Sequence, residues 1–550
     1  MKLKQNDCDK VVINEVSLSK QQAEIVLYNG NIVVSASAGT GKTRTMVSKI
    51  VYDLEQNNTH KVIAAITFTI KAAQEIRDRL FVDVSHNFIG TNNSFAIEEI
   101  IKPFMKDVYG EEYDKDFDTD YTSKDFLFDS FVDGIEIMRS CGIISKYCTQ
   151  SYCKVHGKDC SSNKTNFVFE LALDIVKKSE ACRLFLQAKY FSIYIDEYQD
   201  CDGEMHNLFK YLQTSLGIRV FAVGDDKQSI YRWRGANPEL FKELTKNDAF
   251  KHFVLTENHR SCKNIQNYSN LLFAETAALY EKSECENRIT IVNRKIADWT
   301  EVITDLLDKD KSSALLRNYD NTPYFGKESS MCGSKKLGQK GVDFVYIPTA
   351  PIESITTKAA WLYMAVARFI LLEDFTVFDF INEVPVEGDV ENKSASVIKK
   401  HLVAISKASE TEEKFGKEFE LISQLFGYGS TDTSSENISK LFETVNDERY
   451  ITSVNFDLPL HCAITIHKSK GLEFEQVIIF LEDYGYSGNV ESSHINNHYV
   501  ACTRAKSKLI IVDTEHDDAK AMREKLNELF SGVDYKDFLL KEPKDKQIKY

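Results

Sequence analysis

The sequence predicts an α/β fold built on parallel β-sheets. Three short apolar runs, at residues 32–34, 191–195 and 220–223, have the length of buried strands, and each runs into a polar cluster. Continuous apolar runs are typical of strands that helices cover on both faces. An α/β sheet presents groups to its ligand at the carboxyl ends of its strands, which is where these polar clusters stand.

The first polar cluster, residues 37–43, reads S-A-G-T-G-K-T and precedes an amphipathic helix pattern at 46–51. Its glycines let backbone N–H groups point at phosphate oxygens, Lys42 brings a positive charge to the β- and γ-phosphates, and the Thr43 hydroxyl suits Mg²⁺. The usual spacing has glycine where this chain has Ala36, but the strand and helix around it restore the match. We therefore expect a nucleoside triphosphate site at Ala36, Ser37, Ala38, Gly39, Thr40, Gly41, Lys42, Thr43 and Arg44.

The second apolar run continues into D-E-Y-Q-D at residues 196–200. Asp196 can hold Mg²⁺ by way of its waters, and Glu197 can accept a proton from an attacking water. A solvated acidic turn is the plain alternative, which the added Y-Q-D makes less favoured.

The third run ends in G-D-D-K-Q-S-I-Y-R-W-R-G-A at residues 224–236. The neutral amide of Gln228 can sense a γ-phosphate. Trp233 and Arg234 offer a stacking face and a backbone contact for single-stranded nucleic acid. A lone tryptophan is more often a core residue, but its arginine and glycine neighbours favour a surface loop.

Further segments follow in a fixed order: L-S-K-Q-Q ending at residue 22, T-F-T-I-K-A-A from 67, G-T-N-N-S-F from 90, N-H-R-S from 258, T-I-H-K-S-K-G-L-E-F from 465 and Y-V-A-C-T-R-A from 499. With the three clusters above, this order resembles superfamily 1 DNA helicases of the UvrD/Rep type along the whole chain. The resemblance implies two RecA-like parallel-sheet lobes with helical insertions, which clasp ATP and Mg²⁺ between them and move 3′ to 5′ along single-stranded DNA.

The same resemblance assigns roles to single residues. Gln22 would read adenine, His259 stands where the family has an aromatic residue that stacks on adenine, and Glu473 would reach the ribose. Arg260 and Arg504 would stabilise the transferring phosphoryl group when the lobes close. The implied DNA contacts, one of which is Asn where the family often has His, are Thr67, Thr69, Lys71, Thr91, Asn93, Tyr231, Trp233, Arg234, Thr465 and His467.

A narrower resemblance rests on the compact length, the I-G-T-N-N segment, K-P-F-M-K-D at residues 102–107 and the N-x-H-Y-V-A-C-T-R-A ending. These features are similar to the UvrD-like helicase subunits of Gabija anti-phage defence, which act with a nuclease of the overcoming-lysogenization-defect (OLD) type that carries a Toprim domain. Three interpretations stay open: a 3′-to-5′ helicase, a translocase that unwinds poorly without a partner, and a regulatory subunit whose nucleotide state controls docking to a nuclease.

The motif order also predicts the domain organisation. The first lobe comprises residues 1–98 and 186–262, interrupted by a helical insertion at 99–185, and the second lobe comprises 263–365 and 455–550, interrupted by a shortened helical insertion at 366–454. We expect an exposed polar loop at 327–341 and a buried helix at 359–372.

Composition agrees with a folded cytoplasmic protein that binds DNA through few cations. The 550 residues carry a net charge of −15, and the first residues lack the apolar core of a secretory signal. Affinity for DNA depends on the cations that face phosphates, so the acidic balance predicts weak, salt-sensitive binding. The acidic stretch at 111–120 is expected to be a solvated loop or a docking surface. Four soft ligands, Cys148, Cys153, His156 and Cys160, either hold structural zinc or are unligated.

Overall fold

The structure is a computed structural model. It describes residues 16–80, 86–109, 167–232, 235–282, 289–293, 299–324, 326–355, 359–385, 394–408, 411–429 and 433–533, together with the backbone of five short strands: β1 (Lys4–Asn6), β2 (Lys10–Ile13), β7 (Ser130–Val132), β8 (Ile135–Ile137) and β18 (Leu539–Lys541). Within these ranges no helix is both long enough and apolar enough to span a bilayer.

The first lobe is a six-stranded sheet in which every paired strand is parallel. Its spatial order is β11 (Lys251–Leu255), β4 (Ile32–Ala36), β10 (Arg219–Gly224), β9 (Tyr190–Ile195), β5 (Val62–Thr67) and β6 (Phe88–Thr91). A small antiparallel sheet of β1, β2 and β3 (Val16–Ser19) precedes it.

Two separate cores cover the faces of this sheet, because successive strand residues point to opposite sides. Ala64 and Ile66 of β5 belong to one core, while Ile63 and Ala65 belong to the other. The first core is completed by η1 (Ile97–Ile101), α5 (Lys102–Tyr109), α7 (Phe167–Lys178), α8 (Glu180–Lys189), α9 (Gly203–Leu216) and α10 (Pro238–Thr245), and the second by α1 (Lys20–Leu27), α2 (Lys42–Gln56) and α3 (Ile70–Arg79). Both faces are covered, as a parallel sheet requires.

The second lobe repeats this plan with a seven-stranded sheet whose paired strands are also parallel. Its order is β14 (Val345–Tyr346), β15 (His461–Thr465), β13 (Ser313–Arg317), β16 (Phe474–Phe480), β17 (Ala505–Asp513), β12 (Ile289–Asn293) and β18. The predicted α/β class, with two parallel-sheet lobes, is confirmed. Its helices are α11 (Lys263–Leu271), α12 (Ala274–Ala277), α13 (Trp299–Leu306), α14 (Ser330–Gln339), α21 (Ser492–Cys502) and α22 (Asp517–Leu529).

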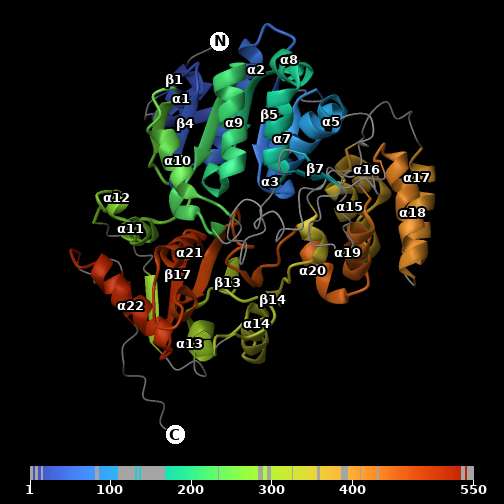
Figure 1. Ribbon diagram of the computed structural model, residues 1–550. Coiled ribbons are helices and arrows are strands. Elements are labelled where there is room, and N and C mark those ends of the chain that lie inside the picture. Colours follow the sequence, from blue (N-terminus) through green and yellow to red (C-terminus); the bar gives the residue numbers. More distant parts are fainter. Residues whose placement is uncertain are drawn as a thin grey trace.

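A separate helical cluster lies beside the two lobes, at the right of Figure 1. It has its own core, which contains Phe380, Phe415 and Phe419. The predicted buried helix at 359–372 is confirmed as the first helix of this cluster. The cluster consists of α15 (Ala360–Leu371), α16 (Val377–Glu383), α17 (Ala395–Lys407), α18 (Glu412–Leu425), α19 (Ser435–Val445) and α20 (Ile451–Val454).

The prediction of a polar loop at 327–341 was wrong, because this segment contains helix α14. Ser329 caps the helix by accepting a hydrogen bond from the Cys332 N–H at 3.2 Å, and Leu337 is fully buried. Gly333 lets the helix approach the sheet closely, since a Cβ there would lie 2.5 Å from Leu315 Cδ2. The glycine and lysine content that suggested a loop therefore serves close helix–sheet packing.

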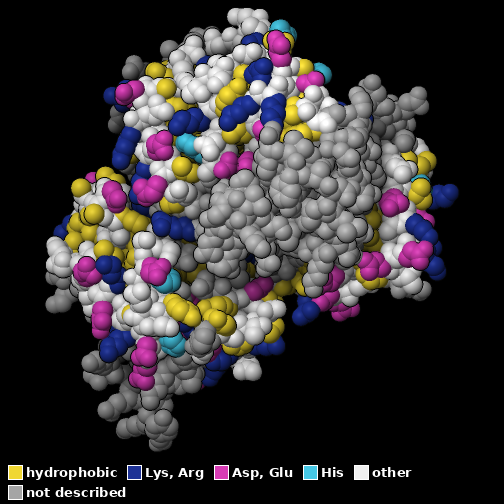
Figure 2. Space-filling view, in the orientation of Figure 1, with side chains coloured by type: hydrophobic (Ala, Val, Ile, Leu, Met, Phe, Trp, Pro, Cys, Tyr) yellow, Lys and Arg dark blue, Asp and Glu magenta, His cyan; other side chains and the backbone are white. Residues whose placement is uncertain are grey.

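On the face shown in Figure 2, lysine and arginine side chains are interspersed with acidic ones over both lobes. That mixture agrees with the acidic but moderate overall charge of −15.

Candidate nucleotide site at the seam of the lobes

The loop between β4 and α2 has the shape of a phosphate cradle. Gly39 and Gly41 adopt left-handed φ angles of +76° and +81°. A side chain at either position would displace a neighbouring side chain: a Cβ on Gly39 would lie 2.5 Å from Asn258 Oδ1, and one on Gly41 would lie 2.8 Å from Gln22 Nε2. Helix α2 begins at Lys42, so its first N–H groups lack intrahelical partners and are available to an anion.

Neighbouring segments hold this loop by its carbonyl groups. Gln22 Nε2 donates to Thr40 O at 3.1 Å, Asn258 Nδ2 to Ala38 O at 3.0 Å, and the His259 N–H to Gly39 O at 2.9 Å. Gln22 itself is fixed by a capping box with Ser19. Two residues expected to contact adenine, Gln22 and His259, therefore flank the cradle.

Three other predicted cradle residues have definite places. Ala36 is 1% exposed within the core behind the loop, which explains why a methyl group is tolerated where the motif has glycine. Ser37 accepts a hydrogen bond from the Thr40 hydroxyl at 2.8 Å. Arg44 instead turns outward and donates to Ser17 O at 2.6 Å, so its guanidinium lies away from the cradle's carbonyl contacts.

Lys42 faces the acidic cluster at the end of β9. Its Nζ lies 3.5 Å from Glu197 Oε1 and has no hydrogen-bond partner within the described residues, although the atom is buried. Glu197 adopts a left-handed φ of +53°, which is strained for a residue with a side chain, and Gln199 donates to its Oε2. A buried ammonium without a hydrogen bond, beside a loop shaped for phosphate, fits an anionic ligand.

The two carboxylates of this cluster are unequal. Burial and the neighbouring charge of Glu197 raise the pKa of Asp196 to about 7. Burial acts in the same direction on Glu197, but the ammonium groups of Lys42 and Lys470 hold its pKa below the usual range. Glu197 is therefore the charged member, which a proton acceptor must be. Asp196, which accepts a hydrogen bond from the Glu197 N–H at 2.9 Å, is the one that a divalent cation would ionise.

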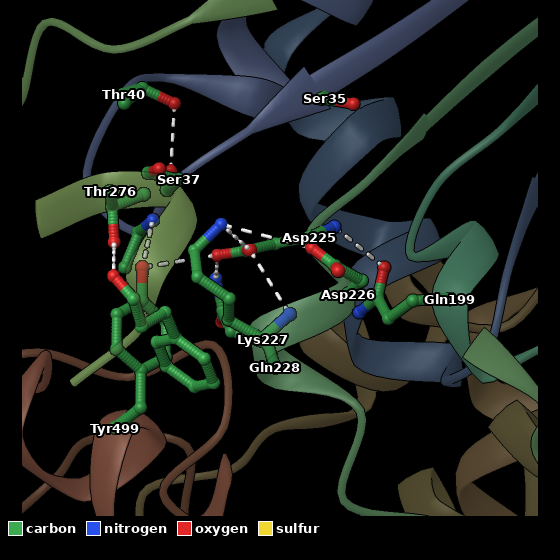
Figure 3. Close-up of polar contacts among 12 residues, drawn as sticks. Ser35, Ser37, Thr40, Gln199, Asp225, Asp226, Lys227, Gln228, Thr276 and Tyr499 are labelled. Atoms are coloured by element: carbon green, nitrogen blue, oxygen red, sulfur yellow. Dashed lines mark hydrogen bonds and ion pairs between the residues drawn. The ribbon is translucent and has the colours of Figure 1, made fainter. Parts of the chain in front are cut away.

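Asp225, at the end of β10, joins the two lobes. It accepts hydrogen bonds from Gln228 Nε2 at 2.8 Å and from the Tyr499 hydroxyl at 3.2 Å, and it forms an ion pair of 2.6 Å with Lys227. Figure 3 shows Tyr499, from the second lobe, pointing toward this group. The Tyr499 hydroxyl also accepts from the Ala38 N–H at 3.2 Å, so one side chain contacts both the cradle and the third cluster.

Two arginines lie where the second lobe meets this site. Arg504, which is 2% exposed, donates to Gln228 Oε1 at 3.3 Å. Burial and the nearby Arg260 guanidinium lower the pKa of Arg504 to about 9, so it stays charged at neutral pH. Arg260 extends from the first lobe to Glu473 Oε2 at 2.8 Å and to Thr503 O at 3.2 Å.

The predicted DNA-contact residues that the structure describes lie in several places: some cap helices of the first lobe, two meet at the seam, and the others have separate local contacts. Thr69 and Thr91 cap helices, each by accepting a backbone N–H at 3.2 Å, and the Thr67 hydroxyl donates to Thr69 O at 2.9 Å. At the seam, the rings of Tyr231 and His467 lie 5.7 Å apart and come from different lobes. Thr465 accepts from the Lys468 N–H at 3.2 Å, Asn93 N–H donates to Asn92, and burial lowers the pKa of Lys71.

Several of the predicted positions fall outside the described residues. These are Trp233, Arg234, the acidic stretch at 111–120 and the four zinc candidates Cys148, Cys153, His156 and Cys160. In the described part of the chain, no cluster of three or more His, Cys, Asp or Glu residues could hold a metal ion.

Some site residues were not predicted, although all of them lie inside quoted motifs. Asn258 and Tyr499 hold the cradle, Asp225 and Asp200 are buried acids of the site, and Lys470 contacts Asp200 and Glu197. These residues are part of the sequence motifs, but the motifs do not show their partners, which come from the other lobe or from distant segments. Only the folded arrangement shows what each one touches.

Comparison with known proteins agrees with this geometry. A family model described as "AAA domain" matches residues 20–234, and one described as "UvrD-like helicase C-terminal domain" matches 460–512. The Gabija protein GajB of Bacillus cereus (strain VD045) is 37% identical over 500 residues, which cover 90% of this chain and 95% of that protein. The chain belongs to the GajB family of UvrD-like helicases.

More distant relatives are DNA helicases. The ATP-dependent DNA helicase Rep of Escherichia coli (strain K12) is 27% identical over 299 residues, 48% of this chain and 44% of Rep. The ATP-dependent DNA helicase PcrA of Staphylococcus epidermidis (strain ATCC 12228 / FDA PCI 1200) is 26% identical over 295 residues, 46% of this chain and 39% of PcrA. The predicted membership of the UvrD/Rep-type superfamily 1 helicases is thus confirmed, and ATP is the nucleotide that such a helicase binds.

Proposed function

We propose that this protein is an ATP-driven motor that moves 3′ to 5′ on single-stranded DNA and separates duplexes. The observation that carries the proposal is a continuous polar path across the seam. Lys42 pairs with Glu197, Glu197 with Gln199, Gln199 with Asp225, Asp225 with Gln228, and Gln228 with Arg504. This path begins at a lysine placed to bind phosphate in one lobe and ends at an arginine of the other lobe. A change in the bound nucleotide can therefore change how closely the two lobes approach each other.

The residues present fit ATP and Mg²⁺. Thr43 and Asp196 would hold the metal, which when bound neutralises charge on the phosphates. Lys42 orients the β- and γ-phosphates, and Glu197 accepts the proton of the attacking water. Arg504 and Arg260 stabilise the phosphoryl group in transfer, and they do so from positions that depend on the closed seam.

Opening and closing of the seam would then move the DNA. Tyr231 lies on the first lobe and His467 on the second, with ring centroids 5.7 Å apart. A nucleotide base stacked on this pair is gripped by both lobes when they are closed and by one when they are open. Loss of the γ-phosphate removes the contact that draws Arg504 toward the first lobe, so each hydrolysis permits one step.

We further propose a nuclease partner of the OLD type with a Toprim domain, in the cytoplasm. Support comes from the relationship to a protein named for the Gabija system, at 37% identity over 90% of this chain. Co-purification from native cells, followed by identification of the bound chains, tests this part independently of the motor.

The decisive experiment measures ATP hydrolysis with and without single-stranded DNA, for the wild type and Lys42→Ala. We expect DNA-stimulated turnover in the wild type and none in the variant, because Lys42 supplies the cradle's phosphate-facing ammonium. Lys340→Ala, which removes only a surface ion pair of 2.5 Å with Glu301, is the matched control. Duplexes tailed at the 3′ or the 5′ end report polarity.

Wild-type protein that binds ATP but shows no DNA-stimulated turnover would reject the motor. It would favour the alternative, a regulatory subunit whose nucleotide state controls docking to a nuclease.

A further inference from the structure

A group of buried charges lies in the second half of helix α2, beyond the phosphate cradle. Lys49 and Asp53 are 1% and 6% exposed, and Lys49 Nζ donates to Asp53 Oδ1 at 2.7 Å and to Tyr28 O at 2.8 Å. Asp53 Oδ2 accepts a hydrogen bond from the Tyr194 hydroxyl and lies 3.7 Å from Arg219 Nη2. No step of the proposed hydrolysis uses these side chains.

Asp53 joins the helix that starts at the cradle to the strand that ends at the acidic cluster. Helix α2 begins at Lys42, and Tyr194 of β9 is three residues before Glu197. The helix and the strand therefore meet twice: Lys42 Nζ lies 3.5 Å from Glu197 Oε1 at the nucleotide site, and Asp53 accepts a hydrogen bond from β9 in the interior. About 16 Å of helix separates the two contacts, at about 1.5 Å per residue. Because a helix is stiff along its axis, the inner contact determines how far Lys42 reaches toward Glu197.

Lys49 joins the same helix to α1. Its ammonium donates to the carbonyl of Tyr28, the C-cap of α1, and α1 carries Gln22, whose amide donates to Thr40 O in the cradle at 3.1 Å. Burial lowers the pKa of Lys49, and the carboxylate of Asp53 opposes that shift. Burying this ion pair costs desolvation free energy that two apolar side chains would avoid. What the pair supplies is direction, because hydrogen bonds depend on geometry whereas hydrophobic contacts do not.

We infer that Lys49 and Asp53 are positioning residues for Lys42, an inference that rests on the proposed function. Their hydrogen bonds fix where α2 lies along β9, and the start of α2 carries the ammonium that faces Glu197 and the phosphates. Apolar side chains at the two positions would allow α2 to lie in several places of similar energy. A shift of about 1 Å at a reacting group can lower turnover about 100-fold. Loss of the pair is therefore expected to slow hydrolysis even where the lobe stays folded.

The test removes the pair without leaving a buried charge, so that positioning and stability are measured separately. The triple variant Lys49→Met, Asp53→Leu, Tyr194→Phe replaces the ions and the tyrosine hydroxyl with apolar groups of similar size, an exchange that is often neutral or stabilising. We expect its Tm to equal or exceed that of the wild type, while kcat for DNA-stimulated ATP hydrolysis falls about 10- to 100-fold, with a smaller change in KM for ATP. Lys102→Met with Glu98→Leu is the matched control, and its kcat should be that of the wild type. It removes an ion pair of 3.0 Å at the same i, i+4 spacing in η1 and α5, which cover the opposite face of the sheet.

Asp53→Asn gives the opposite combination of stability and activity. Its amide keeps the shape of the carboxylate and can still form hydrogen bonds with Lys49 and Tyr194, but the buried ammonium loses its counter-charge. We expect this variant to have a lower Tm than the triple variant and yet a higher kcat, so the two quantities rank the variants in opposite order. A triple variant with the kcat of the wild type, or kcat values that follow Tm across the variants, overturns the inference alone. Absence of DNA-stimulated turnover in the wild type overturns the proposed function itself, so the two failures are distinguishable.

Discussion

Gly39 shows how one missing side chain determines a binding loop. Its φ of +76° is strained for other residues, and a Cβ would lie 2.5 Å from Asn258 Oδ1 and 2.9 Å from Arg260 Cβ. Because Asn258 holds the loop through Ala38 O, such a clash displaces the support as well as the loop.

Gly39→Ala is therefore expected to weaken ATP binding at least about tenfold and to lower the free energy of unfolding by about 1–3 kcal/mol. Gly217→Ala is the matched control: Gly217 has φ of +67°, and a methyl group added there would meet nothing within 4 Å, so only backbone strain of about 1 kcal/mol applies. Fluorescent-nucleotide titration and thermal melts measure both effects. Equal ATP affinity in the two variants would contradict the steric argument.

Arg504, unlike Gly39, has a proposed role that depends on a partner in the other lobe, Gln228. Arg504→Ala should retain ATP binding, since Lys42 and the cradle are unchanged, but should lose hydrolysis by about 10³-fold or more. Equilibrium binding and single-turnover hydrolysis separate the two steps. Normal turnover in this variant would refute the assigned role of Arg504 in stabilising the transferring phosphoryl group.

At the scale of one element, helix α21 places a neutral histidine inside the second lobe. His498 Nε2 lies 2.8 Å from the Tyr268 hydroxyl, and Tyr484 and Cys502 also face the ring. Burial lowers the pKa of His498 to about 3. Unfolding exposes the imidazole to water and returns its pKa to about 6.5, so the unfolded chain binds this proton first as pH falls.

The titration of His498 therefore leaves the free energy of unfolding unchanged above pH 6.5. Between pH 6.5 and about 3 it lowers the free energy of unfolding as the pH falls. At pH 5 the loss from this group is about 2 kcal/mol. His498→Gln, which lacks the titration, should lose about that much less stability than the wild type between pH 7.5 and 5 in urea unfolding. Parallel pH profiles would show that His498 is accessible to protons in the folded state.

At the scale of the whole molecule, the net negative charge of the protein opposes its binding to DNA. The net charge is −15, and the surface in Figure 2 mixes both signs. If about four phosphates are contacted, affinity for single-stranded DNA should fall about 50-fold between 50 and 200 mM salt. Fluorescence anisotropy of a labelled oligonucleotide measures the slope. Affinity that does not change with salt would exclude phosphate contacts as its main source.

The fold class of this chain was predictable from sequence, and ATP-site residues could be proposed from it, because both inferences depend on local patterns. Buried parallel strands need continuous apolar runs, and a phosphate cradle needs glycines, lysine and a hydroxyl at fixed spacing. For the segment at 327–341, the local pattern led to a wrong prediction. Its glycine and lysine content indicated a loop, whereas Gly333 packs against Leu315 within a helix.

By itself the sequence determined which residues are proposed to carry the chemistry, including Lys42, Glu197, Gln228 and Arg504. Only the tertiary structure decided which of them meet: Arg504 reaches Gln228 from 276 positions away, and Lys470 reaches Asp200 from 270 positions away. The physical reason is that motif spacing constrains the backbone within one turn or loop. Contacts across a seam depend instead on how two independently packed cores are placed against each other.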